Sequence, residues 1–234
     1  MRLPKYVALT VGLTAAFSLA VPAAAQTHQV PEQGDAAANP VEDCLPAEGE
    51  EYSDDAVSQC ILASLPDIVG TTHAASIVAV VANGIASGFS DGTFRPNADV
   101  SRAQMATFLS QALDLQPSED AELPEDVDAD SPHADAIAAI IQAGIAQGKA
   151  DGSFAPHDTV SRGQMATMLT AALGLDTRAG GDVPEDAEGS VHADAIAAIL
   201  ENGVASGFAD GSFRPHGDVS RGQMATFITL GLGL

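Results

Sequence analysis

Apolar residues recur with helical spacing in three short stretches of the chain. In the second of these, Ala134, Ile137, Ala138 and Ile141 follow the i, i+3, i+4, i+7 pattern of a helix with one buried face. The stretches open after the N-cap types Thr71, Ser131 and Ser190 and close at Gly84, Gly144 and Gly203. Glycine favours helix ends because it accepts the left-handed conformation there. The pattern predicts three short helices.

A second kind of apolar stretch follows each of the first. Met105, Phe108, Leu109 and Ala112 form one helical stripe, and its counterpart in the next copy begins at Met165. Each stretch starts with Ser followed three residues later by Gln, which is the signature of a capping box. The predicted pairs are Ser101 with Gln104, Ser161 with Gln164, and Ser220 with Gln223. These are three further helices, and their methionines face a core instead of forming a cofactor site.

The two kinds of helix alternate because the chain contains an internal repeat. The segment 84–94 returns at 144–154 and 203–213, and His-Ala-Asp-Ala-Ile-Ala-Ala-Ile occupies both 133–140 and 192–199. The predicted fold is all-α, mainly helical, with helix-loop-helix units at 67–115, 124–175 and 183–234. One such unit cannot bury its apolar face alone, so the three units should pack together.

The N-terminal residues have the pattern of a secretory signal peptide. Arg2 and Lys5 precede an uncharged run from Val7 to Val21, and an Ala-x-Ala ending leads to cleavage after Ala25. The run is shorter than the about 20 residues that a membrane helix needs. We therefore expect residues 1–25 to direct export, with no membrane insertion after cleavage.

An acidic segment at 26–66 separates the signal peptide from the repeats and contains both cysteines. In an exported chain, Cys44 and Cys60 are expected to form a disulfide that ties down a flexible segment. A reactive thiol or a metal ligand is the competing role, but no neighbouring His or second Cys pair supports either one.

The charge balance excludes several classes of partner. The chain has 9 Lys and Arg against 32 Asp and Glu, for a net charge of -23. Nucleic acids and anionic lipid surfaces are bound through clustered Lys and Arg, so neither is an expected partner. The chain also lacks a nucleophile elbow, a phosphate loop and a His-Glu-x-x-His motif. We expect no enzymatic activity and no cofactor.

The repeated turn and the helix that follows it resemble a known family. The run Gly-Ile-Ala-Ser-Gly-Phe-x-Asp-Gly-Thr-Phe-Arg-Pro-Asn-x-x-Val-Ser-Arg-Ala-Gln-Met-Ala, from Gly84, is similar to the S-layer homology (SLH) domain, and all three copies match. The resemblance implies three SLH units in a pseudo-threefold bundle. It also implies a secreted protein that attaches to the cell wall or cell surface by binding cell-wall polysaccharide, often with pyruvylated sugars. An envelope adaptor or self-assembling protein that uses the repeats as a protein interface is the alternative function.

Candidate glycan-binding residues lie at the repeated arginine positions. Arg102, Arg162 and Arg221 occupy the first position of the second helices, where free N–H groups and the helix dipole favour an anion. Arg95 and Arg214 share another position. A structural Arg–Asp bridge is the competing role for these side chains. Because the second copy has Ala155 in place of Arg95 and Arg214, we expect Arg102 and Arg221 to matter more than Arg162.

Aromatic residues are a further candidate set, because a sugar ring stacks on an aromatic face. The family often has an aromatic residue in the first helix, where this chain has Ala74, Ala134 and Ala193. The aromatic surface on which a sugar would stack must then come from other residues, unless these are buried in the core. The candidates are Phe89, Phe94, Phe154, Phe208 and Phe213.

The repeated histidines His73, His133 and His192 could meet near a threefold axis, but helix-start histidines without a metal are the favoured interpretation. Asp126, Asp128 and Asp130 lack the Gly and Glu of a calcium loop, so they are interpreted as acidic linker. No metal is expected.

Overall fold

The computed structural model describes residues 41–45, 53–177 and 180–234. The predicted signal peptide at 1–25, and residues 26–40 of the acidic segment, lie outside this part of the chain. The helices are α1 (Asp54–Ser64), α2 (Ala74–Ala82), α3 (Arg102–Ala112), α4 (Ala134–Gln142), α5 (Arg162–Leu173), α6 (Ala193–Glu201) and α7 (Arg221–Leu232). Three 3-10 turns, η1 (Glu42–Cys44), η2 (Pro66–Ile68) and η3 (Glu185–Ala187), complete the elements. The described residues contain no sheet, which confirms the all-α prediction.

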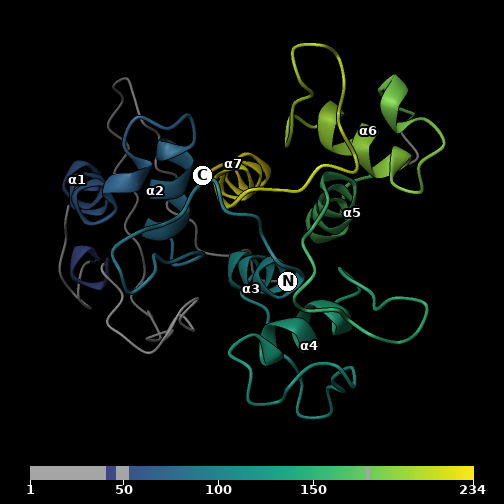
Figure 1. Cartoon of the computed structure of the whole chain (residues 1–234), viewed down its shortest axis with the longest axis horizontal. Helices are drawn as coiled ribbons and strands as arrows, with labels where there is room; N and C mark the ends of the chain where they lie inside the picture. The colour runs from purple at the N-terminus through teal and green to yellow at the C-terminus, as the bar shows by residue number, and fades with distance from the viewer. Residues whose placement is uncertain (1–40, 46–52, 178–179) are drawn as a thin grey trace.

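The three units form a closed ring around a pseudo-threefold axis. In Figure 1, α3, α5 and α7 stand nearly end-on around the centre, and α2, α4 and α6 lie outside them. Each outer helix packs on the central helix of the preceding unit: α4 on α3, α6 on α5, and α2 on α7. The third unit therefore contacts the first, and the predicted bundle is confirmed.

A ring of backbone hydrogen bonds surrounds the axis where the central helices begin. The amide nitrogen of Val100 donates to the carbonyl oxygen of Val219 at 2.8 Å, Val219 donates to Val160 at 3.0 Å, and Val160 donates to Val100 at 2.9 Å. All three valine side chains are fully buried. Each unit thus holds both of the others, although the three belong to no regular strand.

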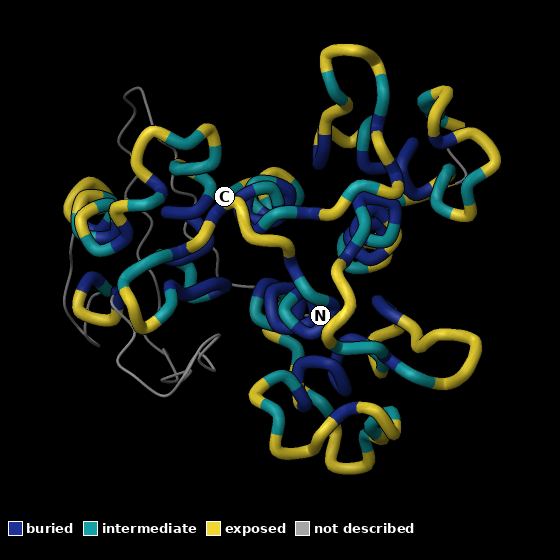
Figure 2. The backbone as a smooth tube through the Cα atoms, in the orientation of Figure 1, coloured by how far each residue is buried: buried dark blue, intermediate teal, exposed yellow. Residues whose placement is uncertain are grey.

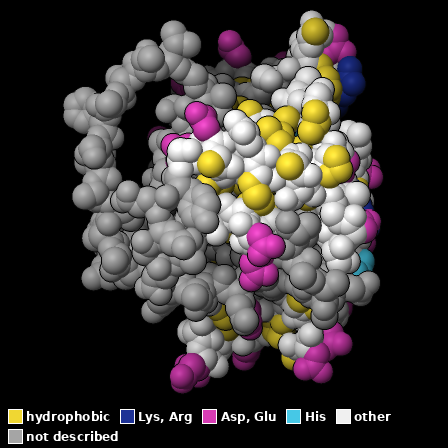
Figure 3. Space-filling model, turned by 90° about the vertical axis from the view of Figure 1, so that its left-hand side faces the viewer, with side chains coloured by type: hydrophobic (Ala, Val, Ile, Leu, Met, Phe, Trp, Pro, Cys, Tyr) yellow, Lys and Arg dark blue, Asp and Glu magenta, His cyan; other side chains and the backbone are white. Residues whose placement is uncertain are grey.

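The core lies along the axis and between each outer helix and its central partner. Met105, Met165 and Met224 are fully buried, as predicted for the methionine stripe. Figure 2 shows the buried segments at the centre of the molecule and the exposed ones at the outer loops. Figure 3 views the side that carries α1, where acidic side chains are scattered over the described surface. No helix among the described residues is long and apolar enough to cross a membrane.

The central helices begin as the sequence predicts. Capping boxes are present at Ser101, Ser161 and Ser220, where each hydroxyl accepts a hydrogen bond from the backbone N–H of the Gln three residues later. The Gln side chain in turn accepts from the backbone N–H of the Ser. Two orphan donors are thereby satisfied at the start of each central helix.

The outer helices begin later than predicted. They start at Ala74, Ala134 and Ala193, and the N-cap positions are held by histidines that make no side-chain cap. The predicted N-caps instead stabilise the preceding turn, since the Ser131 hydroxyl accepts from the backbone N–H of His133 at 3.3 Å. At the other end the prediction is confirmed: Gly144 has a φ of 71°, in the left-handed region that an L side chain rarely adopts.

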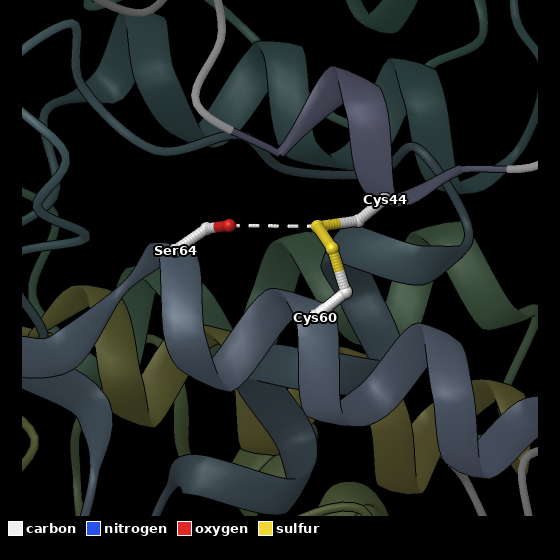
Figure 4. Close-up of a disulfide and its surroundings, with 3 residues drawn as sticks. All are labelled: Cys44, Cys60 and Ser64. Carbon is white, nitrogen blue, oxygen red and sulfur yellow. Dashed lines mark hydrogen bonds between the residues drawn. A yellow bond between two sulfur atoms is a disulfide. The ribbon is translucent and has the colours of Figure 1, made fainter.

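The N-terminal segment adds a helix that the sequence analysis did not predict. Helix α1 packs on α2 and buries Val57 and Ile61 against the first unit. The predicted disulfide between Cys44 and Cys60 is present, with a Cα–Cα distance of 5.4 Å, and it fastens η1 to α1. In Figure 4 the Cys44 sulfur also lies beside the hydroxyl of Ser64, at 3.5 Å. The first unit thus carries a cross-linked helix on its outer side.

Candidate functional site at the joints between units

The repeated arginines of the central helices lie inside the joints between units. A joint is the contact between one central helix and the turn of the following unit, and it is named by that helix. The α3 joint includes the turn of the second unit, the α5 joint that of the third, and the α7 joint that of the first. Arg102, Arg162 and Arg221 are 5%, 4% and 1% exposed. A side chain at the first position of a helix is ordinarily exposed, but these three are buried.

Each buried arginine is held by backbone carbonyl groups of the next unit. The Nε atoms of Arg102, Arg162 and Arg221 donate to the carbonyl oxygens of Phe154, Phe213 and Phe94 at 2.7, 2.7 and 2.8 Å. Their Nη2 atoms donate to the carbonyl oxygens of Gln147, Ser206 and Ser87 at 3.1, 3.3 and 3.0 Å. The guanidinium groups thus join neighbouring units through carbonyl oxygens, where an Arg–Asp bridge was the structural alternative.

The N–H groups at the start of the central helices are also occupied. In the α7 joint, the backbone N–H of Arg221 donates to the carbonyl oxygen of Ala98 at 2.9 Å, and that of Gly222 donates to Pro96 at 2.8 Å. The third N–H, from Gln223, donates to the capping hydroxyl of Ser220 at 3.3 Å. The α3 and α5 joints repeat these contacts. The free N–H groups predicted as an anion site are absent from all three helix starts.

Burial lowers the pKa values of these three arginines, but their guanidinium groups remain charged. Burial, and to a smaller extent the nearby Arg95, lowers the pKa of Arg221 to about 10, against the opposing effect of Asp67. A pKa near 10 still leaves the guanidinium charged at neutral pH. The structure therefore keeps a positive charge in the wall of each joint.

Two joints contain a second, exposed guanidinium on a shared aromatic ring. Arg95 lies 3.8 Å from the centre of the Phe89 ring, and Arg221 lies 4.8 Å from the same centre. About half of the Arg95 side-chain surface is exposed, and its Nη2 donates to Asp91 at 2.8 Å. The α7 joint therefore brings two like charges onto one ring, the outer of them accessible to solvent.

The α5 joint has the same arrangement in the third unit. Arg214 lies 3.8 Å and Arg162 lies 4.9 Å from the centre of the Phe208 ring, and Arg214 pairs with Asp210 at 2.9 Å. Hydrogen bonds from Ser212, and then from Arg214, hold the pKa of Asp210 at about 2. Because Phe94, Phe154 and Phe213 are fully buried, only Phe89 and Phe208 of the predicted aromatic set reach the surface.

The α3 joint lacks this arrangement, which changes the observation on which the predicted ranking of the arginines rested. Its turn carries Lys149 in place of the phenylalanine and Ala155 in place of the exposed arginine. Arg102 faces this turn, because each central helix contacts the turn of the following unit. The arginines beside an exposed partner are therefore Arg162 and Arg221, whereas the sequence analysis favoured Arg102 and Arg221.

Three aspartates hold the turns in place, a role that the sequence analysis assigned to none of them. Asp67 accepts hydrogen bonds from the backbone N–H groups of Phe94 and Arg95 at 2.9 and 2.7 Å. Asp126 and Asp186 do the same in the other units. The residue so held has a positive φ, 58° at Arg95. The interpretation of Asp126 as acidic linker is thus corrected. The sequence pattern that could have indicated its role is the recurrence of Asp two residues after a proline, at Asp126 and Asp186.

The repeated histidines belong to separate joints. The Nδ1 atoms of His73, His133 and His192 each lie 2.8 Å from a threonine hydroxyl, of Thr226, Thr107 and Thr167 respectively. Burial lowers the pKa of all three. Within the described ranges no group of three or more His, Cys, Asp or Glu side chains is arranged to hold a metal ion.

Comparisons with known proteins agree with this architecture. The model of the S-layer homology domain matches residues 65–106, 125–166 and 186–225, together more than half of the chain. An uncharacterised cell wall amidase of Bacillus anthracis is 35% identical over 59% of this chain and 26% of its own length. The surface-layer 125 kDa protein of Lysinibacillus sphaericus is 34% identical over 58% of this chain and 11% of its own. The S-layer protein EA1 of Bacillus anthracis is 31% identical over 71% of this chain and 20% of its own.

The chain spans about a quarter or less of the length of these curated relatives. Their names describe larger proteins, of which the aligned part is a fraction. The match to the family model, by contrast, covers all three repeated units of this chain. The chain belongs to the S-layer homology domain family and is a secreted protein of the cell surface or cell wall.

Proposed function

We propose that this chain attaches to the bacterial cell wall by binding an anionic polysaccharide, pyruvylated glycans included, at the α5 and α7 joints. The observation that carries the proposal is the convergence of two guanidinium groups on Phe89 and again on Phe208. A chain with a net charge of -23 has few basic residues, and these two joints use four of them.

Like charges held close together favour an anion beside them. Arg95 and Arg214 present planar, half-exposed guanidinium groups that can donate two parallel hydrogen bonds to one carboxylate. Asp91 and Asp210 already pair with these two arginines at 2.8 and 2.9 Å, and an anionic sugar would share or replace that partner beside the paired guanidinium groups. Arg162 and Arg221 act from behind the ring: they hold the units together and supply charge, while Arg95 and Arg214 make the contact.

The family and the relatives support attachment at the coarser level. S-layer proteins and a cell wall amidase share this region, so it accompanies proteins whose names indicate different roles at the wall. A module common to such proteins is best explained by a shared place of attachment. On this proposal the described part of the chain binds and does not catalyse.

The test is sedimentation of the secreted protein with purified cell-wall sacculi. Arg95→Ala combined with Arg214→Ala should abolish cosedimentation and leave the fold intact, because the second unit already carries Ala155 at that position, with a φ of 53°. Lys149→Ala is the matched control, since it removes a cation from the α3 joint and should leave binding unchanged. Added salt should weaken binding, because exposed charges are screened beyond about 8–10 Å at ordinary ionic strength.

Two outcomes would reject the proposal. In the first, the folded double variant still sediments with sacculi. In the second, the unaltered protein binds equally well after the polysaccharide has been extracted. The second result would favour an envelope protein as the partner, which is the alternative function raised by the sequence.

A further inference from the structure

One repeat position places a different side chain beside the start of each central helix. This is the residue whose carbonyl oxygen accepts the hydrogen bond from the first helical N–H. It is Asp158 in the α3 joint, Gly217 in the α5 joint and Ala98 in the α7 joint, with N–O distances of 2.9, 2.8 and 2.9 Å. Only the α3 joint therefore has a carboxylate attached at this point.

The carboxylate of Asp158 balances the cations of the α3 joint. Its Oδ2 atom lies 2.5 Å from the Nζ atom of Lys149, the residue that replaces the phenylalanine of the other turns. Burial lowers the pKa of Arg102, and Asp158 is the first group that opposes this effect. In the α3 joint, Asp158 thus interacts with both the exposed Lys149 and the buried Arg102.

In the other two joints the exposed arginine pairs with its own aspartate, Asp91 or Asp210, but no carboxylate stands at the position of Asp158. Arg214 further lowers the pKa of Arg162, just as Arg95 further lowers that of Arg221, so each buried arginine meets a second cation. Homologous aspartates, Asp67, Asp126 and Asp186, oppose these effects in all three joints and therefore do not distinguish them. The difference between the joints lies in Asp158 and in the exposed arginine.

We propose that Asp158 is a built-in substitute for the ligand's anion, so that the α3 joint is occupied by the chain itself and only the α5 and α7 joints bind glycan. This inference rests on the proposed function and adds the number and position of the binding joints. It also assigns a specificity-determining role to the position of Asp158, Gly217 and Ala98. A carboxylate at this position prevents glycan from binding at that joint, and a small uncharged residue allows it to bind.

The α5 joint has room for the change that tests this role. A Cβ atom added to Gly217 would lie 3.9 Å from Cδ of Arg162 and 3.3 Å from the carbonyl oxygen of Arg214. Gly217 is not among the residues with a positive φ, so a side chain there requires only a small shift of that carbonyl. Ala98 already carries a Cβ atom and is exposed, so an aspartate is accommodated there without backbone change.

The experiment is isothermal titration of the full secreted chain with a methyl glycoside that carries a pyruvyl ketal. The methyl ester of the same glycoside, which has no charge, is the control probe. The unaltered protein should bind two molecules of the acid and none of the ester. Gly217→Asp and Ala98→Asp should each remove one site, whereas the neutral matches Gly217→Asn and Ala98→Asn should keep both.

Removal of the Asp158 carboxylate should create a binding site at the α3 joint. Replacing Asp158 by Ala, together with Lys149→Phe and Ala155→Arg, gives the α3 joint the residues of the other two and should yield a third site. In the unaltered protein, the NMR signals of the Arg162 and Arg221 Nε–H groups should shift at saturation, and that of Arg102 should stay in place. Thermal unfolding of each variant checks the fold, and Ala98→Asp decides the question if Gly217→Asp does not fold.

The outcomes separate this inference from the proposed function. Three equivalent sites in the unaltered protein would overturn the inference alone, as would two remaining sites in Ala98→Asp. Failure of the unaltered protein to bind the glycoside and the sacculi would reject the proposed function, and the inference with it.

Discussion

The Nε atom of Arg221 lies 2.8 Å from the carbonyl oxygen of Phe94, which is 127 residues earlier in the chain. This hydrogen bond joins the last helix to the first repeated turn and so closes the ring of three units. The two other arginines make the same bond between consecutive units, over 52 and 51 residues. One local motif thereby serves both to link neighbours and to close the bundle.

Arg221→Ala should lower the free energy of unfolding by about 3 kcal/mol or more, because two carbonyl groups lose a charged donor in a buried place. Arg221→Lys should restore part of the loss, since an ammonium keeps the charge but not the planar fork. Urea unfolding measures both. Arg95→Ala is the control and should cost less than about 1 kcal/mol, as its ion pair is exposed. Equal urea midpoints for Arg221→Ala and the unaltered protein would show that the buried contacts do not hold the ring.

Reduction of the Cys44–Cys60 disulfide should lower stability by about 3 kcal/mol, given the 16-residue separation of the two cysteines. The loss should appear first in α1, which the disulfide holds against the first unit. Urea unfolding with and without reductant measures the effect, and the Cys44→Ser/Cys60→Ser double variant should not respond to reductant. Two reactive thiols per chain in native secreted material would contradict the pairing.

Ser161→Ala should cost about 1 kcal/mol, because it removes the hydroxyl that accepts from the backbone N–H of Gln164. Thermal unfolding provides the measurement. Ser90→Ala is the matched control, since Ser90 is exposed and lies in a turn outside any helix. An unchanged melting temperature for Ser161→Ala would mean that the cap contributes nothing to the stability of α5.

Stability should fall as the pH drops below about 6.5, the ordinary pKa of histidine. Burial lowers the pKa of His73, His133 and His192, so the unfolded chain binds protons more readily than the folded one. Their contribution is full above pH 6.5 and is lost as the pH falls through the folded pKa values.

Melting temperatures across this range test the histidine prediction, and NMR titration of the three imidazoles should give midpoints below 6.5. His192→Gln should make the pH dependence shallower. A pH dependence that survives replacement of all three histidines would assign it to other groups. At lower pH, protonation of Asp91 and Asp210, whose pKa values are held at about 2, should cause a separate loss.

The sequence by itself determined the features that depend on a few neighbouring residues. The capping box at Ser161 and Gln164 and the helix end at Gly144 follow from hydrogen bonds and backbone sterics within one turn of helix. The repeat identified three equivalent units, and the buried methionine stripes followed from spacing alone. The SLH resemblance added the threefold bundle, and local patterns could not have supplied it.

Only the tertiary structure decided what each arginine does. The first position of a helix indicates an exposed side chain beside free N–H groups, but the turn of the next unit covers Arg102 and takes up those groups. Which turn covers which helix depends on how the ring closes, and that is set by contacts between residues some 50 to 127 positions apart. For this reason the presence of Ala155 affects Arg102, which lies in the preceding unit. Arg162 is only seven residues further along the chain than Ala155, but it lies beside the exposed Arg214 of the third unit.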